Sequence, residues 1–341
     1  MPAEWENPSS ILMAYPAPHT DWNYILPEAR AQFDAIIRAL VDGEERVILL
    51  SDGSIEPEVR EMIKYAGGLV IEDIDYNDTW TRDYGPITIV ADGRKIEIDF
   101  GFNGWGLKFA ADKDNLVNLQ LIKAGHASYR SYLNRRDFIL EGGSIESDGK
   151  GTILTTSRCL CSDNRNGGLD KLNAEANLRR ILGAKHVLWL DYGFMEGDDT
   201  DSHIDTLARL APDDSIIYVA PPEDEDDVHY AELKEMELQL KGFKTAEGAP
   251  FRLIPLPFPD AIYDEDGQRL PATYANYLVT GTNIFIPTYG QPEKDARAVE
   301  AIGSAFPNHR VFTVDCRTLI RQHGSLHCST MQKYSELSFD D

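Results

Sequence analysis

The chain has 341 residues, of which 42% are hydrophobic and 26% are charged. These values are typical of a globular protein and exclude a mainly disordered, collagen-like or coiled-coil chain. Lys and Arg total 33 against 57 Asp and Glu, which gives a formal net charge of −24. Such a charge repels phosphate backbones and anionic lipids and attracts cations, although it can also serve solubility alone. We therefore expect a cationic small-molecule partner, no nucleic acid and no membrane.

The N-terminus and the cysteines indicate the compartment. The first ten residues carry acids where a secretory signal would carry Lys or Arg, and no apolar run reaches the length of a membrane span. The four cysteines, Cys159, Cys161, Cys316 and Cys328, lack the paired C-x-x-C groups of a zinc site. We expect a cytoplasmic protein with free thiols, without a disulfide or a metal.

Apolar residues repeat with helical spacing in several segments. Phe33, Ile36, Ile37 and Leu40 predict a helix that Pro27 opens and Gly43 closes. Val59, Met62, Ile63 and Ala66 predict a second helix between Pro57 and Gly67. Three more amphipathic helices are expected near 170–182, 228–241 and 293–305. Each would pack one apolar stripe against a sheet.

Four pairs of short apolar strands, each joined by a polar turn, predict β-hairpins. They cover residues 87–100, 143–155, 206–220 and 274–287. The residues at or near their heads are Asp83, Glu141, His203 and Tyr274, and Cys328 takes a fifth, truncated position. A period of roughly 60 residues predicts five copies of one unit arranged radially, as in a propeller. The heads would then converge at the axis, unless the spacing is that of an ordinary α/β protein.

Two segments carry a nucleophile and a base. His203 and Asp205 are two residues apart, so on a strand both side chains would face one side. Cys328 lies among Gly, Ser, His and Thr residues, a setting in which a thiolate can form, whereas buried inert thiols are the commoner case. Cys316 follows a strand, and Cys159 and Cys161 lie in a polar segment, so these three thiols are poorer candidates.

Three further polar residues indicate a cation site. Glu141 precedes two glycines, a pattern that more often marks a simple turn. Asp83 and Trp80 lie in the sequence DTWTRDYGP, where an acid and an indole could hold a cation between charge and ring face. A thiol, an imidazole and several carboxylates together favour attack on an electrophile that is itself cationic. A guanidinium meets that condition because its N–H groups pair with carboxylates.

Six motifs carry a family resemblance across nearly the whole chain. They read, in order, EWENPSSILMAYP, DTWTRDYGP, LEGGSIESDG, NRN, TDSHIDT and GSLHC. This series resembles the agmatine deiminases and the bacterial peptidylarginine deiminase-type proteins grouped with them. The resemblance implies the pentein fold of the guanidine-modifying superfamily, a five-bladed pseudo-fivefold α/β propeller. It implies one domain over residues 1–341, in agreement with the repeat.

The resemblance also assigns roles. It places the nucleophile at Cys328, the general acid and base at His203, the guanidinium-binding acids at Asp83 and Asp205, and a further catalytic or binding acid at Glu141. Trp80 would join these acids in binding substrate, and no metal or organic cofactor is expected. Agmatine would give N-carbamoylputrescine and ammonia through a thiouronium intermediate on the cysteine.

Three points of the pattern leave alternatives open. Tyr84, Glu146 and the His323–Ser325 segment depart from the residues usual in agmatine deiminases. A deiminase of free or peptide-terminal arginine would need a cation for the substrate carboxylate, and Arg158 or Arg165 could supply it. A non-catalytic binding protein is the remaining alternative, and a homo-oligomer is left open.

Overall fold

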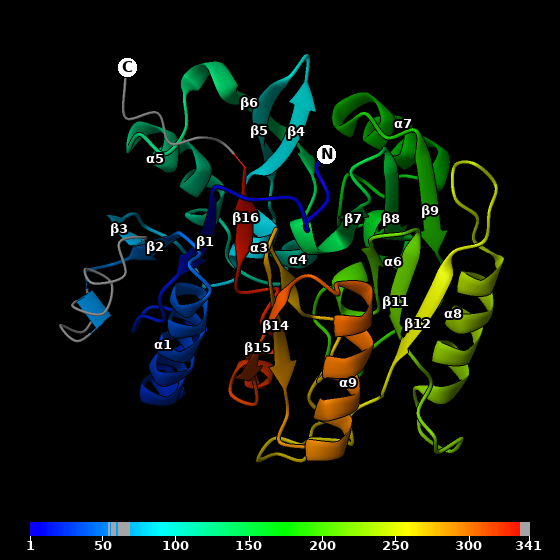
Figure 1. Ribbon diagram of the computed structural model, residues 1–341. Helices are drawn as coiled ribbons and strands as arrows, with labels where there is room; N and C mark the ends of the chain where they lie inside the picture. The colour runs from blue at the N-terminus through cyan, green and yellow to red at the C-terminus, as the bar shows by residue number, and fades with distance from the viewer. Residues whose placement is uncertain (54, 56–58, 61–68, 335–341) are drawn as a thin grey trace.

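Five small sheets form the body of the molecule in the computed structural model, which describes residues 1–53, 55, 59–60 and 69–334 (Figure 1). The helix predicted between Pro57 and Gly67 lies largely outside the described residues. The first sheet contains β16 (Met331–Lys333), β1 (Ser10–Ala14), β2 (Val47–Ser51) and β3 (Leu69–Asp73), and the second contains β4 (Ile87–Ala91), β5 (Arg94–Gly101) and β6 (Tyr132–Ile139). The third contains β7 (Ile145–Ser147), β8 (Thr152–Thr156) and β9 (His186–Leu190), and the fourth contains β10 (Ala208–Ala211), β11 (Ser215–Val219) and β12 (Arg252–Leu256). The fifth contains β13 (Leu278–Val279), β14 (Asn283–Thr288) and β15 (Arg310–Asp315).

Every sheet contains the same three-strand unit, which confirms the predicted repeat. Two antiparallel strands form a pair, and a third strand runs parallel to the second after a crossover; the first sheet adds β3, parallel to β2. In the first sheet the antiparallel pair joins the two ends of the chain, because β16 pairs with β1. The truncated fifth position of the repeat is therefore completed by the N-terminal strand.

Four long helices make crossovers and link neighbouring sheets. They are α1 (Leu26–Asp42), α7 (Lys171–Leu182), α8 (Tyr230–Gly242) and α9 (Pro292–Ala305), close to the predicted segments. In α1 the first turn holds a proline, and the predicted apolar stripe from Phe33 to Leu40 is buried. The helices α8, α9 and α1 contact β9, β12 and β15, each the last strand of the preceding sheet. Contact between α1 and β15 links the fifth sheet back to the first.

The remaining elements are short. They are the helices α3 (Thr81–Tyr84), α4 (Gly104–Leu107), α5 (Val117–Lys123) and α6 (Ser157–Leu160), and the 3-10 turns η1 (Asp21–Ile25), η2 (Asp114–Leu116), η3 (Tyr129–Ser131), η4 (Gly142–Ser144), η5 (Ile204–Thr206) and η6 (Leu319–Gln322). Among the described residues, no helix is long and apolar enough to span a bilayer. Placement in the cytoplasm stays a prediction.

A tight turn leads into the first strand of each sheet. These turns carry Asp83 in α3, Glu141 before η4, His203 before η5, and Cys328 before β16. The fourth hairpin is shorter than predicted, since β13 begins at Leu278 and not at Tyr274. The Tyr274 hydroxyl donates to Asp295 of α9, 2.7 Å away, so it anchors a helix. The residue that takes the head position there is Asn276.

Candidate active site

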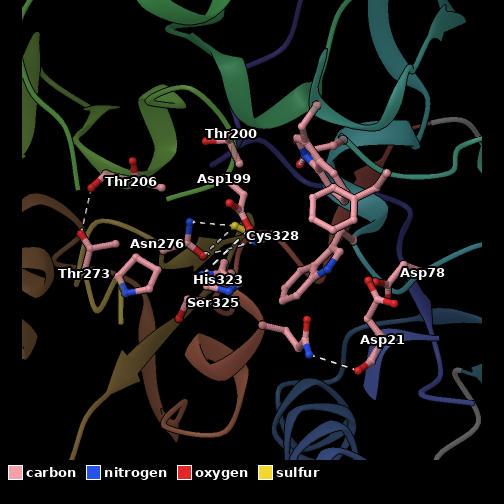
Figure 2. Close-up of a pocket in the computed structure, with 17 residues that line it drawn as sticks. Asp21, Asp78, Asp199, Thr200, Thr206, Thr273, Asn276, His323, Ser325 and Cys328 are labelled. Atoms are coloured by element: carbon pink, nitrogen blue, oxygen red, sulfur yellow. Dashed lines mark hydrogen bonds and ion pairs between the residues drawn. The ribbon is translucent and has the colours of Figure 1, made fainter. Parts of the chain in front are cut away.

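Cys328 lies on the wall of a cleft formed by these turns. Its side chain is only 5% exposed, and the exposed part faces the cleft (Figure 2). The acidic and aromatic residues of the lining are Asp21, Asp78, Asp83, Asp199, Trp80, Trp105 and Phe109. No Lys or Arg lines this cleft among the residues that the structure describes. The cleft therefore combines a thiol with an excess of negative charge, which suits a cation.

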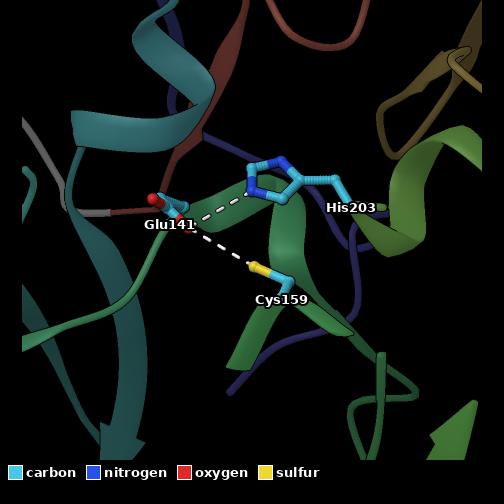
Figure 3. Close-up of side chains that lie close together, drawn as sticks. All are labelled: Glu141, Cys159 and His203. Atoms are coloured by element: carbon cyan, nitrogen blue, oxygen red, sulfur yellow. Dashed lines mark hydrogen bonds and ion pairs between the residues drawn. The ribbon is translucent and has the colours of Figure 1, made fainter. Parts of the chain in front are cut away.

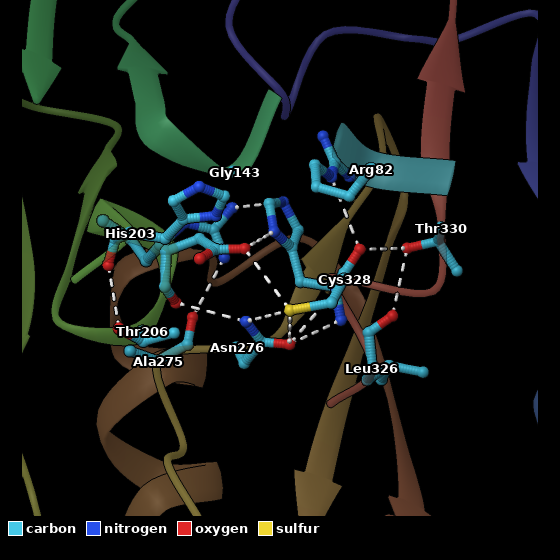
Figure 4. A network of polar contacts seen from close by, with 12 residues as sticks. Arg82, Gly143, His203, Thr206, Ala275, Asn276, Leu326, Cys328 and Thr330 are labelled. Carbon is cyan, nitrogen blue, oxygen red and sulfur yellow. Dashed lines mark hydrogen bonds and ion pairs between the residues drawn. The ribbon is translucent and has the colours of Figure 1, made fainter. Parts of the chain in front are cut away.

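Two side chains contact the Cys328 sulfur. Asn276 Nδ2 lies 3.2 Å from Sγ, and Asp205 Oδ2 lies 3.8 Å from it (Figure 4). Asn276 Oδ1 also accepts from the backbone N–H groups of His327 and Cys328, at 2.9 and 3.3 Å. Burial, followed by the charges of Asp205 and Asp83, raises the pKa of the Cys328 thiol well above its usual value. A bound cation would offset those charges and favour the thiolate.

Asp83 is held by two N–H donors. Its Oδ1 accepts from Gly143 N and its Oδ2 from Trp105 Nε1, both at 2.9 Å. Trp105 has a left-handed φ of 56°, between two glycines that also have positive φ. That strained turn aims the indole at the carboxylate. Burial raises the pKa of Asp83 to about 6, against the opposing effect of His203. Sequence reasoning missed Trp105; the GWG pattern beside an aromatic strand end was its only signal.

Gly143 explains the pair of glycines after Glu141. A Cβ at this position would lie 2.7 Å from His203 Nδ1, 2.9 Å from Asp83 Oδ1 and 3.0 Å from Asp205 Oδ2. Any side chain there would collide with all three groups. The missing side chain thus lets the imidazole and both carboxylates converge on one point.

His203 is fully buried among acids. Its Nε2 is 3.3 Å from Glu141 Oε2 and its Nδ1 is 3.6 Å from Asp83 Oδ1. Burial lowers the pKa of His203, but the charge of Asp83, the contact with Cys159 and the bond to Glu141 outweigh it and raise the pKa well above its usual value. The imidazole is therefore protonated at neutral pH and can donate a proton.

Glu141 is the centre of a second buried group (Figure 3). Both of its oxygens accept from Arg165 Nε, at 2.9 and 2.8 Å, and Cys159 Sγ lies 3.5 Å from Oε2. Burial raises the pKa of Glu141, but the hydrogen bond to His203 and the charge of Arg165 outweigh burial and lower it. Glu141, Cys159 and His203 are residue types that bind zinc, but the Glu141 carboxylate is already paired with Arg165. The donor set fits an ion-pair network better than a metal.

Two expectations are wrong here. Cys159 is not in a polar loop: it lies in α6, fully buried against Glu141, because the Thr156 hydroxyl caps this turn by accepting from Cys159 N. Arg165 cannot serve a substrate carboxylate, since Glu141 and Asp201 already occupy its guanidinium. Arg158 packs over the ring of Phe194, 6.0 Å from its centroid, and is absent from the cleft lining.

Asp205 and Trp80 complete the predicted set. Asp205 is fully buried, and its Oδ2 lies 2.8 Å from His327 Nδ1. Burial raises the pKa of Asp205, but the bond to His327 and nearby cationic groups lower it overall. Trp80 lines the cleft beside Gly324, where a Cβ would come within 2.3 Å of the indole. Trp80, Asp83 and Cys328 line the cleft, whereas Glu141, His203 and Asp205 are buried beside them and are not part of its lining.

Known proteins resemble this chain along its whole length. A family model described as Porphyromonas-type peptidyl-arginine deiminase matches residues 1–333. The chain belongs to this family. A "putative agmatine deiminase" of Legionella pneumophila strain Philadelphia 1 is 32% identical over 337 residues, which cover 98% of this chain and 94% of the relative.

Solved structures agree with the family and the fold. The crystal structure of a "putative peptidyl-arginine deiminase" is 46% identical with a TM-score of 0.93 and covers 98% of both chains. A Cys-to-Ser variant of C. jejuni agmatine deiminase with substrate bound is 37% identical with a TM-score of 0.89, over 98% of this chain and 96% of that one. The pentein fold and the class of guanidine-modifying C–N hydrolase, both predicted from the motifs, are confirmed.

Proposed function

We propose that this chain is a deiminase that converts agmatine and water into N-carbamoylputrescine and ammonia. The observation that carries the proposal is the charge of the cleft. A thiol faces a space lined by carboxylates without Lys or Arg among the described residues. Agmatine is cationic at both ends, whereas the carboxylate of arginine would meet like charge there.

Substrate binding prepares the nucleophile. Asp83 and Asp205 pair with the guanidinium N–H groups, and the positive charge between them offsets the two carboxylates that raise the pKa of Cys328. The thiol then loses its proton to solvent, since His203 is already protonated, and the resulting thiolate attacks the central carbon of the guanidinium. Asn276 Nδ2 stays in contact with the sulfur and orients it.

Proton transfer by His203 completes two half-reactions. The protonated imidazole gives its proton to the departing nitrogen, so the C–N bond breaks, ammonia leaves and an S-alkyl thiouronium remains on Cys328. Neutral His203 then takes a proton from water, which attacks the same carbon and breaks the C–S bond. The ureido product leaves and the thiol is restored. Glu141 holds the imidazole through Nε2 in both halves.

Deimination of arginine is the second candidate. The family description and the name of one close structure both refer to arginine or peptidyl-arginine. Ammonia and ureido product should be measured side by side with agmatine, free arginine and an arginine-terminated peptide, and with buffer alone. We expect agmatine to give the highest kcat/KM. A higher value for either arginine substrate would overturn the assignment, and no turnover of any guanidine would overturn the enzyme class.

Two further predictions accompany this proposal. Residues 1–341 would form a single catalytic domain, because the repeat uses both ends of the chain to build one sheet. The enzyme would need no organic cofactor or metal, because the thiol, the imidazole and the acids supply the nucleophile, the proton donor and the charge.

A further inference from the structure

We propose that His327 and Glu4 are positioning residues that hold the Asp205 carboxylate in its substrate-binding orientation, so that the N-terminal segment completes the active site. The inference rests on the proposed function, since that function assigns Asp205 to the guanidinium. Neither residue lines the cleft, and both act from beneath it.

His327 is fully buried between two acids and a guanidinium. Its Nδ1 lies 2.8 Å from Asp205 Oδ2, its Nε2 lies 2.9 Å from both oxygens of Glu4, and Arg209 Nη2 lies 3.0 Å from the same Nε2. An ionised carboxylate only accepts, so Nδ1 carries a proton and donates it to Asp205. In this neutral form Nε2 has no proton, so it accepts from Arg209 Nη2, which also donates to Glu4, and it makes no hydrogen bond of its own to the Glu4 oxygens. Burial, then Arg209 and Arg82, lower the pKa of His327, which favours this neutral form.

Glu4 keeps the guanidinium groups beside His327 in place. Its carboxylate binds Arg82 Nη1 at 2.8 Å and Arg209 Nη2 at 2.5 Å, and the side chain is only 10% exposed. Burial raises the pKa of Glu4, but Arg82, His327 and Arg209 outweigh burial and lower it well below its usual value. Without this charge, Arg82 would lose the acid with which it pairs, and Arg209 would keep only Glu146.

The two oxygens of Asp205 are therefore unlike. His327 occupies Oδ2, whereas Oδ1 is buried and has no hydrogen-bond partner among the described residues. A buried carboxylate oxygen without a donor costs free energy unless a ligand supplies one. The arrangement leaves one oxygen for a guanidinium N–H and fixes the plane of the carboxylate through the other. If the carboxylate were free to rotate, it would lose this preorganisation for the substrate.

Two variants of nearly equal size separate positioning from folding. His327→Asn keeps an N–H near the Nδ1 position, toward Asp205, while His327→Gln reaches the Nε2 position, toward Glu4. We expect His327→Asn to retain kcat/KM within about tenfold of wild type and His327→Gln to lose about 10²-fold, through a higher KM as well as a lower kcat. In a Cys328→Ser background, the Kd for agmatine from calorimetry should rise in the Gln variant only. Tm is measured for each protein.

Glu4→Gln tests the other half of the network if both His327 variants misfold. It keeps the shape and removes the charge, and we expect kcat/KM with agmatine to fall about tenfold or more. Equal kcat/KM and Kd in the Asn and Gln variants, or a Glu4→Gln protein with wild-type KM and kcat, would overturn the inference alone. A wild-type chain that releases no ammonia from any guanidine would overturn the proposed function, and this inference with it.

Discussion

Two groups of buried charge meet at Asp205, and they are balanced differently. Beneath it, Glu4 and Glu146 are paired with the guanidinium groups of Arg82 and Arg209. On the cleft side, Asp83 accepts from neutral N–H groups, and its basic neighbour is the imidazole of His203 instead of a guanidinium. The acids of the lower group are paired with cations of the protein itself, whereas the cleft keeps negative charge that a bound cation could neutralise.

The pKa values differ between single acids but do not divide the two groups, because burial also raises the pKa of Glu146 to about 8 despite its pairing with Arg209. Arg82, His327 and Arg209 outweigh burial and hold the pKa of Glu4 well below its usual range, whereas burial raises the pKa of Asp83 to about 6 and that of Asp78 to about 7. Buried carboxylates with raised pKa values destabilise the fold at neutral pH, and such costs collect at functional sites. The absence of Lys and Arg from the described cleft lining, rather than the pKa values alone, supports the proposal that the substrate binds on the cleft side of Asp205.

Removal of the nucleophile should have the largest effect. Cys328→Ala leaves Asp83 and Asp205 in place, so agmatine should still bind while ammonia release falls by about 10⁴-fold or more. Ammonia assays measure the loss, and calorimetry measures the retained binding. Cys161→Ser is the matched control, because this cysteine lies outside the cleft lining and should keep wild-type turnover. Turnover in the alanine variant above about 1% of wild type would contradict the nucleophile assignment.

Neutralising the cleft acid should come next. Asp83→Asn removes the charge that pairs with the guanidinium and supports protonated His203, so kcat/KM should fall about 10²-fold. Asp137→Asn is a control on an exposed acid that pairs with Arg135 at the surface, and it should leave kcat/KM unchanged. If both variants behave alike, the contrast between the cleft and the rest of the surface fails.

Acid pH should reproduce part of that loss in the wild type. Protonation of Asp83, with its pKa of about 6, removes the negative charge, so kcat/KM should rise with pH through about 6 and fall toward tenfold per unit below it. Trp105→Phe deletes the N–H donor that lowers the pKa of Asp83, so the acid limb should move to higher pH. A limb near pH 4 in both proteins would show that Asp83 ionises as an ordinary surface acid.

Much of this contrast was visible in the sequence. The repeated hairpins and their polar heads predicted five units, and they predicted that Asp83, Glu141, His203 and Cys328 lie close together. Both predictions were possible because strand periodicity and turn residues are local signals. The tertiary partners were not predictable. Asn276 follows a buried tyrosine that looked like the start of a strand, and Trp105 reaches Asp83 only through a left-handed turn.

The ion pairs show the same limit. Arg165 was weighed as a partner for substrate, yet it is paired with Glu141, and Cys159 was placed in a loop although it is buried beside that acid. Nothing in the spacing of charged residues tells which pairs will meet after sheets from distant segments pack. Glu4 is the clearest case, since its partner His327 lies 323 residues away.

Replacing an acid of the outer cleft, near the expected tail of the substrate, should reduce kcat/KM less than replacing Asp83. Burial raises the pKa of Asp199 against the effects of His323, whose Nδ1 is 3.9 Å from the carboxylate, and of Lys108, whose Nζ donates to the Asp199 backbone oxygen. Asp199→Asn should raise KM for agmatine about tenfold with little change in kcat. The control substrate is a short alkylguanidine without an amine, whose KM should not change. Equal effects on both substrates would assign Asp199 to the guanidinium end or to the fold.

The smallest expected effect is on stability, and its sign is opposite. Burial raises the pKa of Asp78 to about 7, so the folded state holds its proton more tightly than the unfolded chain, and stability is lost as pH rises from about 4 to about 7.

Asp78→Asn keeps the acceptor for Thr79 N and removes the charge. Since cleft water screens part of the cost, the variant should be more stable by about 1–2 kcal/mol at pH 8 and equal to wild type at pH 4, in denaturant titrations at each pH. Glu4→Gln should lose stability under the same conditions, because it removes the acid that pairs with buried Arg82 and one of the two acids that pair with buried Arg209. A destabilised Asp78→Asn protein at pH 8 would mean that the cleft acid is already balanced in the free enzyme.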